Sequence, residues 1–270
     1  MLMTSVLLWL TAALYAVAAS LYVLHLAKGK DNVASWAGNV LGAAVLLNVS
    51  YLGSDWFHDA RPVDIHQALA VLSLVVVLVF LITGRTRTRL RVLGAFITPV
   101  TLLLFLGAAF RRAPETVPEP VRSAMLPVHV GVNILGLAAF AFAFAAGAAY
   151  VIQERQLRKK NLGGVFQRLP ALDVLDQIGL RSVLVGFPLL TIGVVTGTMF
   201  AVNLETGSVG LSPAQGFGLL AWLLFAAVLL LRVAAGWRGR KAAIGTILGF
   251  LCTMLVLLGY VLRDTMGVGA

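Results

Sequence analysis

Four histidines, His25, His58, His66 and His129, are the side chains in this sequence best suited to bind a metal. A neutral imidazole nitrogen is the commonest protein ligand for metal ions and a frequent axial ligand of haem iron. The single cysteine, Cys252, cannot form a CxxC pair, and the sequence contains no P-loop, Rossmann or zinc-protease motif. Any site chemistry is therefore expected at imidazole groups.

The composition determines what kind of fold holds these histidines. Of the 270 residues, 60% are hydrophobic and only 12% are charged, whereas about 25% of the residues in soluble domains are charged. This excludes a water-soluble fold. The net charge of +10 is typical of nucleic-acid binding, but in so apolar a chain the basic residues serve first to orient membrane spans, and we expect no nucleic-acid partner.

Eight uncharged runs are long enough to cross a bilayer core of about 30 Å as helices. They cover residues 3–27, 33–53, 65–83, 92–110, 128–151, 182–203, 216–231 and 242–262. The sequence therefore predicts an all-α fold, a polytopic membrane helix bundle of about eight transmembrane helices. We expect residues 1–270 to form a single integral membrane domain within the lipid bilayer.

The basic residues gather in alternate loops. Five of the 21 follow even-numbered spans, namely Arg61, Arg111, Arg112, Arg122 and Arg263, and the other sixteen follow odd-numbered spans. Cytoplasmic loops of membrane proteins are enriched in Lys and Arg. This asymmetry predicts a multi-pass protein of the inner (cytoplasmic) membrane with both termini outside the cytoplasm.

Three of the four histidines lie at one membrane level in this orientation. His58 is in the outer loop SDWFHDARPVD, and His66 and His129 are at the outer starts of spans three and five. A haem with two histidine ligands needs two rings at matching depth, a condition that His66 and His129 meet. His25 lies near the inner end of span one, too far away to share an iron with them. The alternative is that each outer histidine makes hydrogen bonds at headgroup level.

The helix face that carries His129 has a polar residue one turn further on and a glycine after that. Asn133, Gly136 and Phe140 follow His129 on the same face of a helix. Such a face would orient an imidazole and leave room for a flat ring, and it would equally serve ordinary helix packing. Trp56, close to His58, is a candidate to cover a porphyrin, with a role as an interfacial anchor as the alternative.

Two further patterns concern packing. Gly193 and Gly197 form a GxxxG motif in the sixth span, which predicts close approach of another helix. The stretch LPALDVLDQIGL, just before that span, repeats Leu172, Leu175 and Ile178 at helical spacing. We expect this stretch to form an amphipathic helix along the membrane surface.

Three stretches of the second half carry a family resemblance. They are LPVHVGVNILGLAAFAFAFAAGAAYVIQERQLRKK, RLPALDVLDQIGLRSVLVGFPLLTIGVVTGTMF and GLLAWLLFAAVLLLRVAAGWRGRKAAIGTILGF. With their spacing, they resemble the cytochrome c assembly family of CcsA and CcmC type, and are most similar to the eight-span HemX and YpjD-like branch. The resemblance is specific from about Leu126 onward.

The resemblance implies that the protein binds b-type haem non-covalently and assists cytochrome c assembly outside the cytoplasm, with other assembly proteins as partners. The histidine of the family's His-Val block falls on His129. The family's second outer histidine, after the last span, is missing here, so either His66 supplies the second ligand of the haem iron, or the protein binds haem weakly or through one histidine. Haem-delivering members have a WGxxWxWD loop, whereas NLETGSVGLSPAQ has no tryptophan. We therefore expect haem handling without enzymatic ligase activity.

Two alternatives remain from the sequence. HemX-like members are associated with the control of haem synthesis through the level of glutamyl-tRNA reductase, which would make a soluble haem-biosynthesis enzyme the partner of the basic cytoplasmic loops. The second alternative is a transporter of another small amphiphile. The absence of Asp, Glu, Lys and Arg well inside the predicted spans disfavours an ion-coupled transporter.

Cysteine labelling in intact cells tests the predicted topology. Cysteines placed at Arg87, Lys159 and Arg240 should resist a membrane-impermeant reagent, because the distribution of basic residues assigns these positions to the cytoplasm. Cysteines placed at Glu115 and Gly207 should react. The reverse pattern would move His66 and His129 to the cytoplasmic side.

Overall fold

The computed structural model describes residues 2–58, 65–110, 125–161, 163–201 and 213–266. The helices within these ranges are α1 (Leu2–Lys28), α2 (Asp31–His58), α3 (Ile65–Thr86), η1 (Thr88–Leu93), α4 (Gly94–Gly107), η2 (Ala108–Phe110), α6 (Met125–Arg158), α7 (Val165–Arg168), α8 (Leu172–Ala201), α9 (Pro213–Ala234) and α10 (Arg240–Met266). These ranges contain no β-strand, so the all-α expectation is confirmed for them.

The expectation of about eight spanning helices is also confirmed. Eight helical segments of the described chain are long and apolar enough to cross a bilayer. One of them, Thr88–Phe110, runs through η1, α4 and η2. Which end of the bundle faces the cytoplasm stays a prediction.

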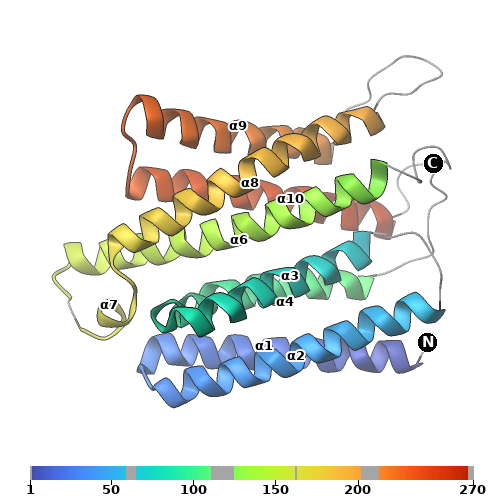
Figure 1. The fold of residues 1–270 in the computed structure, drawn as a ribbon, viewed down its shortest axis with the longest axis horizontal. Coiled ribbons are helices and arrows are strands. Elements are labelled where there is room, and N and C mark those ends of the chain that lie inside the picture. The colour runs from blue at the N-terminus through green and yellow to red at the C-terminus, as the bar shows by residue number, and fades with distance from the viewer. Residues whose placement is uncertain (1, 59–64, 111–124, 162, 202–212, 267–270) are drawn as a thin grey trace.

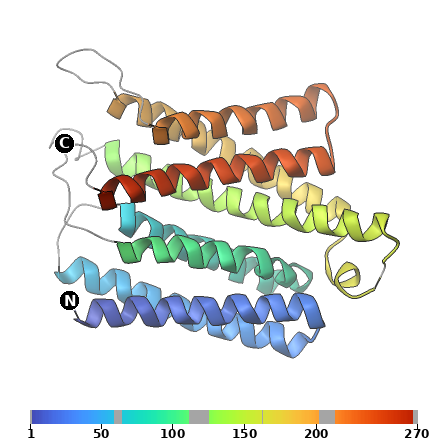
Figure 2. The same ribbon diagram turned by 180° about the vertical axis from the view of Figure 1, so that it is seen from behind.

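The long helices form two groups that lie side by side. Figures 1 and 2 show α1 to α4 along one side of the bundle and α6, α8, α9 and α10 along the other. Helix α3 joins the groups, because it packs against α4 and also against α6. The helix ends form two ends of the bundle. Residues 85–91 and 155–160 lie at what we call the basic end, and α6 begins at what we call the histidine end (Figure 1).

The expectation of a separate surface helix at LPALDVLDQIGL was wrong. From Leu172 onward these residues form the first turns of α8, which continues without interruption to Ala201. The sixth spanning helix therefore begins about ten residues earlier than the sequence pattern predicted. Leu175 is buried in the core, and the charge of Asp176 has a partner inside the bundle. Both contacts hold this stretch against the neighbouring helices.

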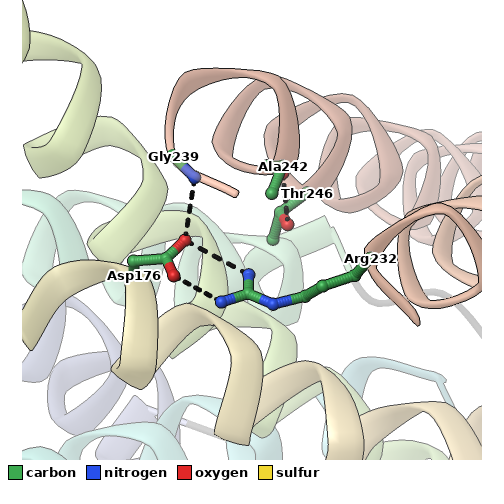
Figure 3. Close-up of polar contacts among 5 residues, drawn as sticks. All are labelled: Asp176, Arg232, Gly239, Ala242 and Thr246. Carbon is green, nitrogen blue, oxygen red and sulfur yellow. Dashed lines mark hydrogen bonds and ion pairs between the residues drawn. The ribbon is translucent and has the colours of Figure 1, made fainter. Parts of the chain in front are cut away.

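That partner of Asp176 is Arg232 on α9 (Figure 3). The Arg232 Nη1 donates a hydrogen bond to Asp176 Oδ1 at 3.2 Å, and its Nη2 donates to the other carboxylate oxygen. The backbone N–H of Gly239 also donates to Asp176 Oδ1, at 3.1 Å. A mostly buried carboxylate is costly unless it is paired and hydrogen-bonded. The three groups together tie the start of α8 to α9 and to the turn that leads into α10.

In the other group, a buried amide connects three helices. Asn48 on α2 donates through Nδ2 to the Tyr15 hydroxyl on α1 at 3.0 Å, to the Ser73 hydroxyl on α3 at 3.0 Å and to the Ala70 carbonyl at 3.3 Å. The ring of Tyr15 packs edge-to-face on Phe105 of α4, with centroids 5.4 Å apart. Hydrogen bonds between polar side chains of neighbouring membrane helices make an otherwise apolar helix contact specific. Asn48 therefore sets the register of α1, α2 and α3.

Replacing Asn48 by Ala should lower the free energy of unfolding by about 1–2 kcal/mol, because it removes the shared donor of Tyr15 and Ser73. Thermal unfolding of the detergent-purified protein measures the loss. Asn39→Ala on the exposed face of the same helix is the matched control and should leave the midpoint unchanged. An equal loss in both variants would show that the Asn48 network adds no specific stability.

Candidate functional site

His129 lies one turn into α6, at the histidine end of the bundle, and its side chain is half-buried. Its Nδ1 is 2.7 Å from the Thr196 hydroxyl of α8. Thr196 donates its own hydroxyl hydrogen back to the Ile192 carbonyl at 2.8 Å, so it accepts the bond from His129. With Thr196 as the acceptor, we assign the proton of the neutral imidazole to Nδ1 and the lone pair to Nε2, the form that a metal ligand requires.

Asn133, one turn further along α6, holds the second ring nitrogen. Its Nδ2 lies 3.2 Å from His129 Nε2 and donates to the His129 backbone carbonyl at 2.7 Å. The bond to the carbonyl is the shorter of the two, so the amide stays anchored if the longer contact to Nε2 is given up. Thr196 and Asn133 thus orient the ring from both sides without placing a formal charge beside it.

The GxxxG motif of α8 provides the space for this pair. A Cβ atom at Gly193 would overlap the Asn133 amide, and a Cβ atom at Gly197 would come within 3.2 Å of His129 Cε1. The sequence pattern predicted a close helix approach at these glycines, and the structure shows which side chains use the room. Thr196 lies between the two glycines and was missed as a site residue, although its place inside the motif was the signal available.

His129 and Asn133 open into a groove with walls from five helices. The histidine groove, as we call it, has an empty volume of about 1130 Å³. Most of its wall is apolar, from residues such as Leu72 of α3, Leu137 of α6 and Leu257 of α10. Its remaining polar wall residues are Thr198, Gln215, Thr253 and Tyr260, none of which the sequence pattern singled out. This volume includes space that is open to the surroundings of the groove.

His66 lies in the first turn of α3 and is 1% exposed. Its Nδ1 donates to the Gly107 carbonyl at 2.8 Å, which holds the ring against the end of α4. The neighbouring Ile65 and Leu69 line the histidine groove, whereas His66 is not among its lining residues. The pairing of His66 and His129 on one iron stays a prediction.

The other predicted residues are not brought to this groove by any described contact. The side chains of Trp56 and His58, at the end of α2, lie outside the described residues. His25 lies in the last turn of α1, at the basic end, with Nδ1 3.1 Å from the Lys30 carbonyl. The structure thus separates His25 from His129, because α1 ends at the end of the bundle where α6 also ends (Figure 1).

The described chain defines a class of protein: a polytopic helical membrane protein with an apolar groove that presents an oriented neutral imidazole. A sequence model of the family described as "Cytochrome C assembly protein" matches residues 63–265. This match covers more than half of the chain. The chain belongs to the cytochrome c assembly protein family.

Similar proteins agree with this assignment. The chain is 27% identical to the "Cytochrome c biogenesis protein CcsA" of Microcystis aeruginosa over 302 residues, which cover 93% of this chain and 90% of that protein. It is 30% identical to the protein of the same name from Prochlorococcus marinus over 203 residues, 66% of this chain and 63% of that one. The match to CcsA proteins favours cytochrome c biogenesis over the HemX-like regulatory alternative.

A solved structure shares the fold. The "Cytochrome c Heme Lyase CcmF" superposes with a TM-score of 0.65 at 18% sequence identity, over 99% of this chain and 51% of that one. This chain therefore spans about half the length of CcmF. At this identity the similarity concerns the fold alone. Because a protein with this fold is named a lyase, the fold does not exclude enzymatic activity. The expectation that this chain has no such activity stays a prediction.

Substitution of Gly193 by Ala should lower the free energy of unfolding by about 1–3 kcal/mol, because the added Cβ meets the hydrogen-bonded Asn133 amide. Thermal unfolding in detergent measures the change. Gly131→Ala on α6 is the matched control, since a Cβ there meets no atom within 4 Å. The control should be neutral or stabilising, by up to about 1 kcal/mol. A destabilised control with an unaffected Gly193→Ala would contradict this account of the contact.

Proposed function

We propose that this membrane protein binds haem in the histidine groove and handles it during cytochrome c assembly. The observation that carries the proposal is the hydrogen bond from His129 Nδ1 to Thr196, which leaves Nε2 as the nitrogen for iron. Haem iron commonly takes a histidine nitrogen as an axial ligand, and a hydrogen bond on the other ring nitrogen orients such ligands. Membership of the cytochrome c assembly family supports haem as the cargo.

The walls of the groove fit the chemistry of a porphyrin. The macrocycle is flat and apolar, and the groove offers mainly aliphatic side chains from five helices. Thr198, Gln215 and Tyr260 stand near the helix ends that face the histidine end. Their hydroxyl and amide groups are suited to the two polar propionates. The sequence has no CxxCH attachment site, so the binding we propose is non-covalent, of the b type.

His129 is the ligand to which the proposal commits. His66 remains the candidate for the second axial nitrogen, and its Nδ1 bond to Gly107 fixes Nε2 as the nitrogen that would bind iron. For His66 to bind the iron, the start of α3 must rotate so that the His66 ring reaches the groove. The neighbouring Ile65 and Leu69 already line that groove. The chain's own contribution is to hold and orient haem, and we assign it no step of covalent attachment.

In the cell we place the protein in the inner membrane, with the histidine end outside the cytoplasm and other cytochrome c assembly proteins as partners. The charge asymmetry of the loops supports this direction. In that orientation the groove opens on the side where cytochrome c is assembled. Haem bound in the groove can then pass to a partner on the same side of the membrane, and it does not have to pass the basic end of the bundle.

His129→Ala should remove the bound haem or weaken its binding by an order of magnitude or more, because it deletes the one oriented imidazole of the groove. The absorption spectrum of protein purified after expression with ample haem measures this, as does haem titration of the apoprotein. His66→Ala should shift a low-spin spectrum toward high spin if His66 supplies the opposite ligand.

His25→Ala is the matched control and should keep the wild-type spectrum, since His25 lies at the basic end. Two results would sink the proposal: a wild-type protein without a Soret band that gains none on titration, or a His129→Ala variant with an unchanged Soret band. Loss of the band in His58→Ala alone would move the site to the end of α2.

A further inference from the structure

A second groove lies at the basic end, far along the bundle from His129. Its deeper part runs between α3, η1, α6 and α8, and is lined by Phe80, Arg87, Leu93, Phe142, Ile178 and Arg181 among others, with an empty volume of about 750 Å³. Its outer part has an empty volume of about 1320 Å³ and extends past Arg89 to Arg168 of α7. Both parts share Arg87 and Leu90. We treat them as one feature and call it the arginine groove.

Three arginines of this groove form no ion pair with any described acidic residue. Within the described ranges, the arginines that form ion pairs are Arg158, Arg232 and Arg240, all elsewhere. Arg87, Arg89 and Arg181 are exposed and have no acidic partner among the described residues. Guanidinium groups match phosphate geometry with paired N–H donors, so the groove is suited to a phosphate.

The arginines of the groove come from segments far apart in the sequence. Arg87 follows α3, whereas Arg181 is on α8 and both line the deeper part of the groove. Arg168 is held in place, because its Nη1 donates to the Leu26 carbonyl at the end of α1 at 2.7 Å. Figure 1 shows α7 and the start of α8 beside the turn that follows α3. Convergence of this kind differs from basic residues scattered over a membrane surface.

The deeper wall is apolar. Phe80, Leu93 and Phe142 line it, and each is at most 9% exposed, so only the edges of these side chains are open to a ligand. A free phosphate ion would gain nothing from these edges, whereas the first methylene groups of an acyl chain would bury apolar surface against them. Basic pockets between membrane helices on the cytoplasmic side are known to hold anionic lipid headgroups. Arginines without an acidic partner among the described residues, next to apolar edges, select a molecule with both a phosphate and a chain.

We propose that the arginine groove binds an anionic phospholipid. Its phosphate lies between Arg87 and Arg181, and the start of one acyl chain lies against the edges of Phe80, Leu93 and Phe142. The bound lipid fills the seam between the helix group of α1 to α4 and the group of α6 to α10. This inference is independent of haem binding, because the two grooves lie at opposite ends of the bundle.

Native mass spectrometry of the detergent-purified full chain tests the proposal. Titration with phosphatidylglycerol should give one bound lipid that survives mild activation, whereas phosphatidylcholine with the same chains should bind at least about tenfold more weakly. The double variant Arg87→Gln/Arg181→Gln should weaken phosphatidylglycerol binding by about tenfold or more. Inorganic phosphate should not compete at concentrations that leave the protein folded, since it lacks the chain.

Lys159→Gln/Lys160→Gln is the matched control. It removes the same two charges from the basic end at exposed positions outside the groove, and should bind phosphatidylglycerol like the wild type. Equal weakening in both double variants would show unspecific attraction to charge and overturn the site. Effective competition by inorganic phosphate would instead make it a free anion site, which also overturns the proposal.

A second measurement applies even if the arginine variant does not fold. Wild-type protein in bilayers that contain photoactivatable phosphatidylglycerol should crosslink at residues 80–93 and 178–182, because these segments form the two walls. Peptide mass spectrometry locates the adducts. Adducts spread evenly along all lipid-facing helices would contradict a defined lipid site.

Discussion

Close approach of α6 and α8 is the constraint on which the histidine groove depends. Lipid tails are as apolar as leucine, so membrane helices associate through tight packing and polar contacts rather than through a hydrophobic driving force. Along α8, Gly186 makes room for the Phe140 ring, Gly193 for the Asn133 amide and Gly197 for the His129 imidazole. The glycines that allow the helices to pack therefore also decide where the imidazole lies.

The polar contacts at this interface are neutral, and that has a physical reason. A carboxylate would orient an imidazole as well as Thr196 does, but a charge among membrane helices is costly unless it is paired. The mostly buried charged pair of Asp176 with Arg232 lies at the basic end and is completed by the Gly239 N–H (Figure 3). It fastens α8 to α9 and α10, the helices that complete the groove wall. Charge thus stabilises one end while the other presents a neutral ligand.

Much of this architecture follows from the sequence, because span length and charge distribution are nearly independent of tertiary contacts. All eight spans and the place of His25 apart from His129 were predictable in this way. The start of α8 was not, since the pattern of Leu172 and Leu175 does not reveal that Asp176 has a partner on α9. Thr196 and Tyr260 were missed for the same reason: their role depends on which helices are neighbours, and helical periodicity alone carries no such information.

The two grooves differ in what they can hold because the bundle separates two kinds of side chain. At the histidine end, an uncharged imidazole in an aliphatic wall suits a ligand bound through a metal, with its polar groups near the helix ends. At the basic end, arginines that have no acidic partner among the described residues lie beside apolar side chains, which suits a ligand bound through an anion. Helices α3, α6 and α8 contribute to both walls. A lipid seated in the second groove would therefore brace the helices that hold His129, Asn133 and Thr196 in register.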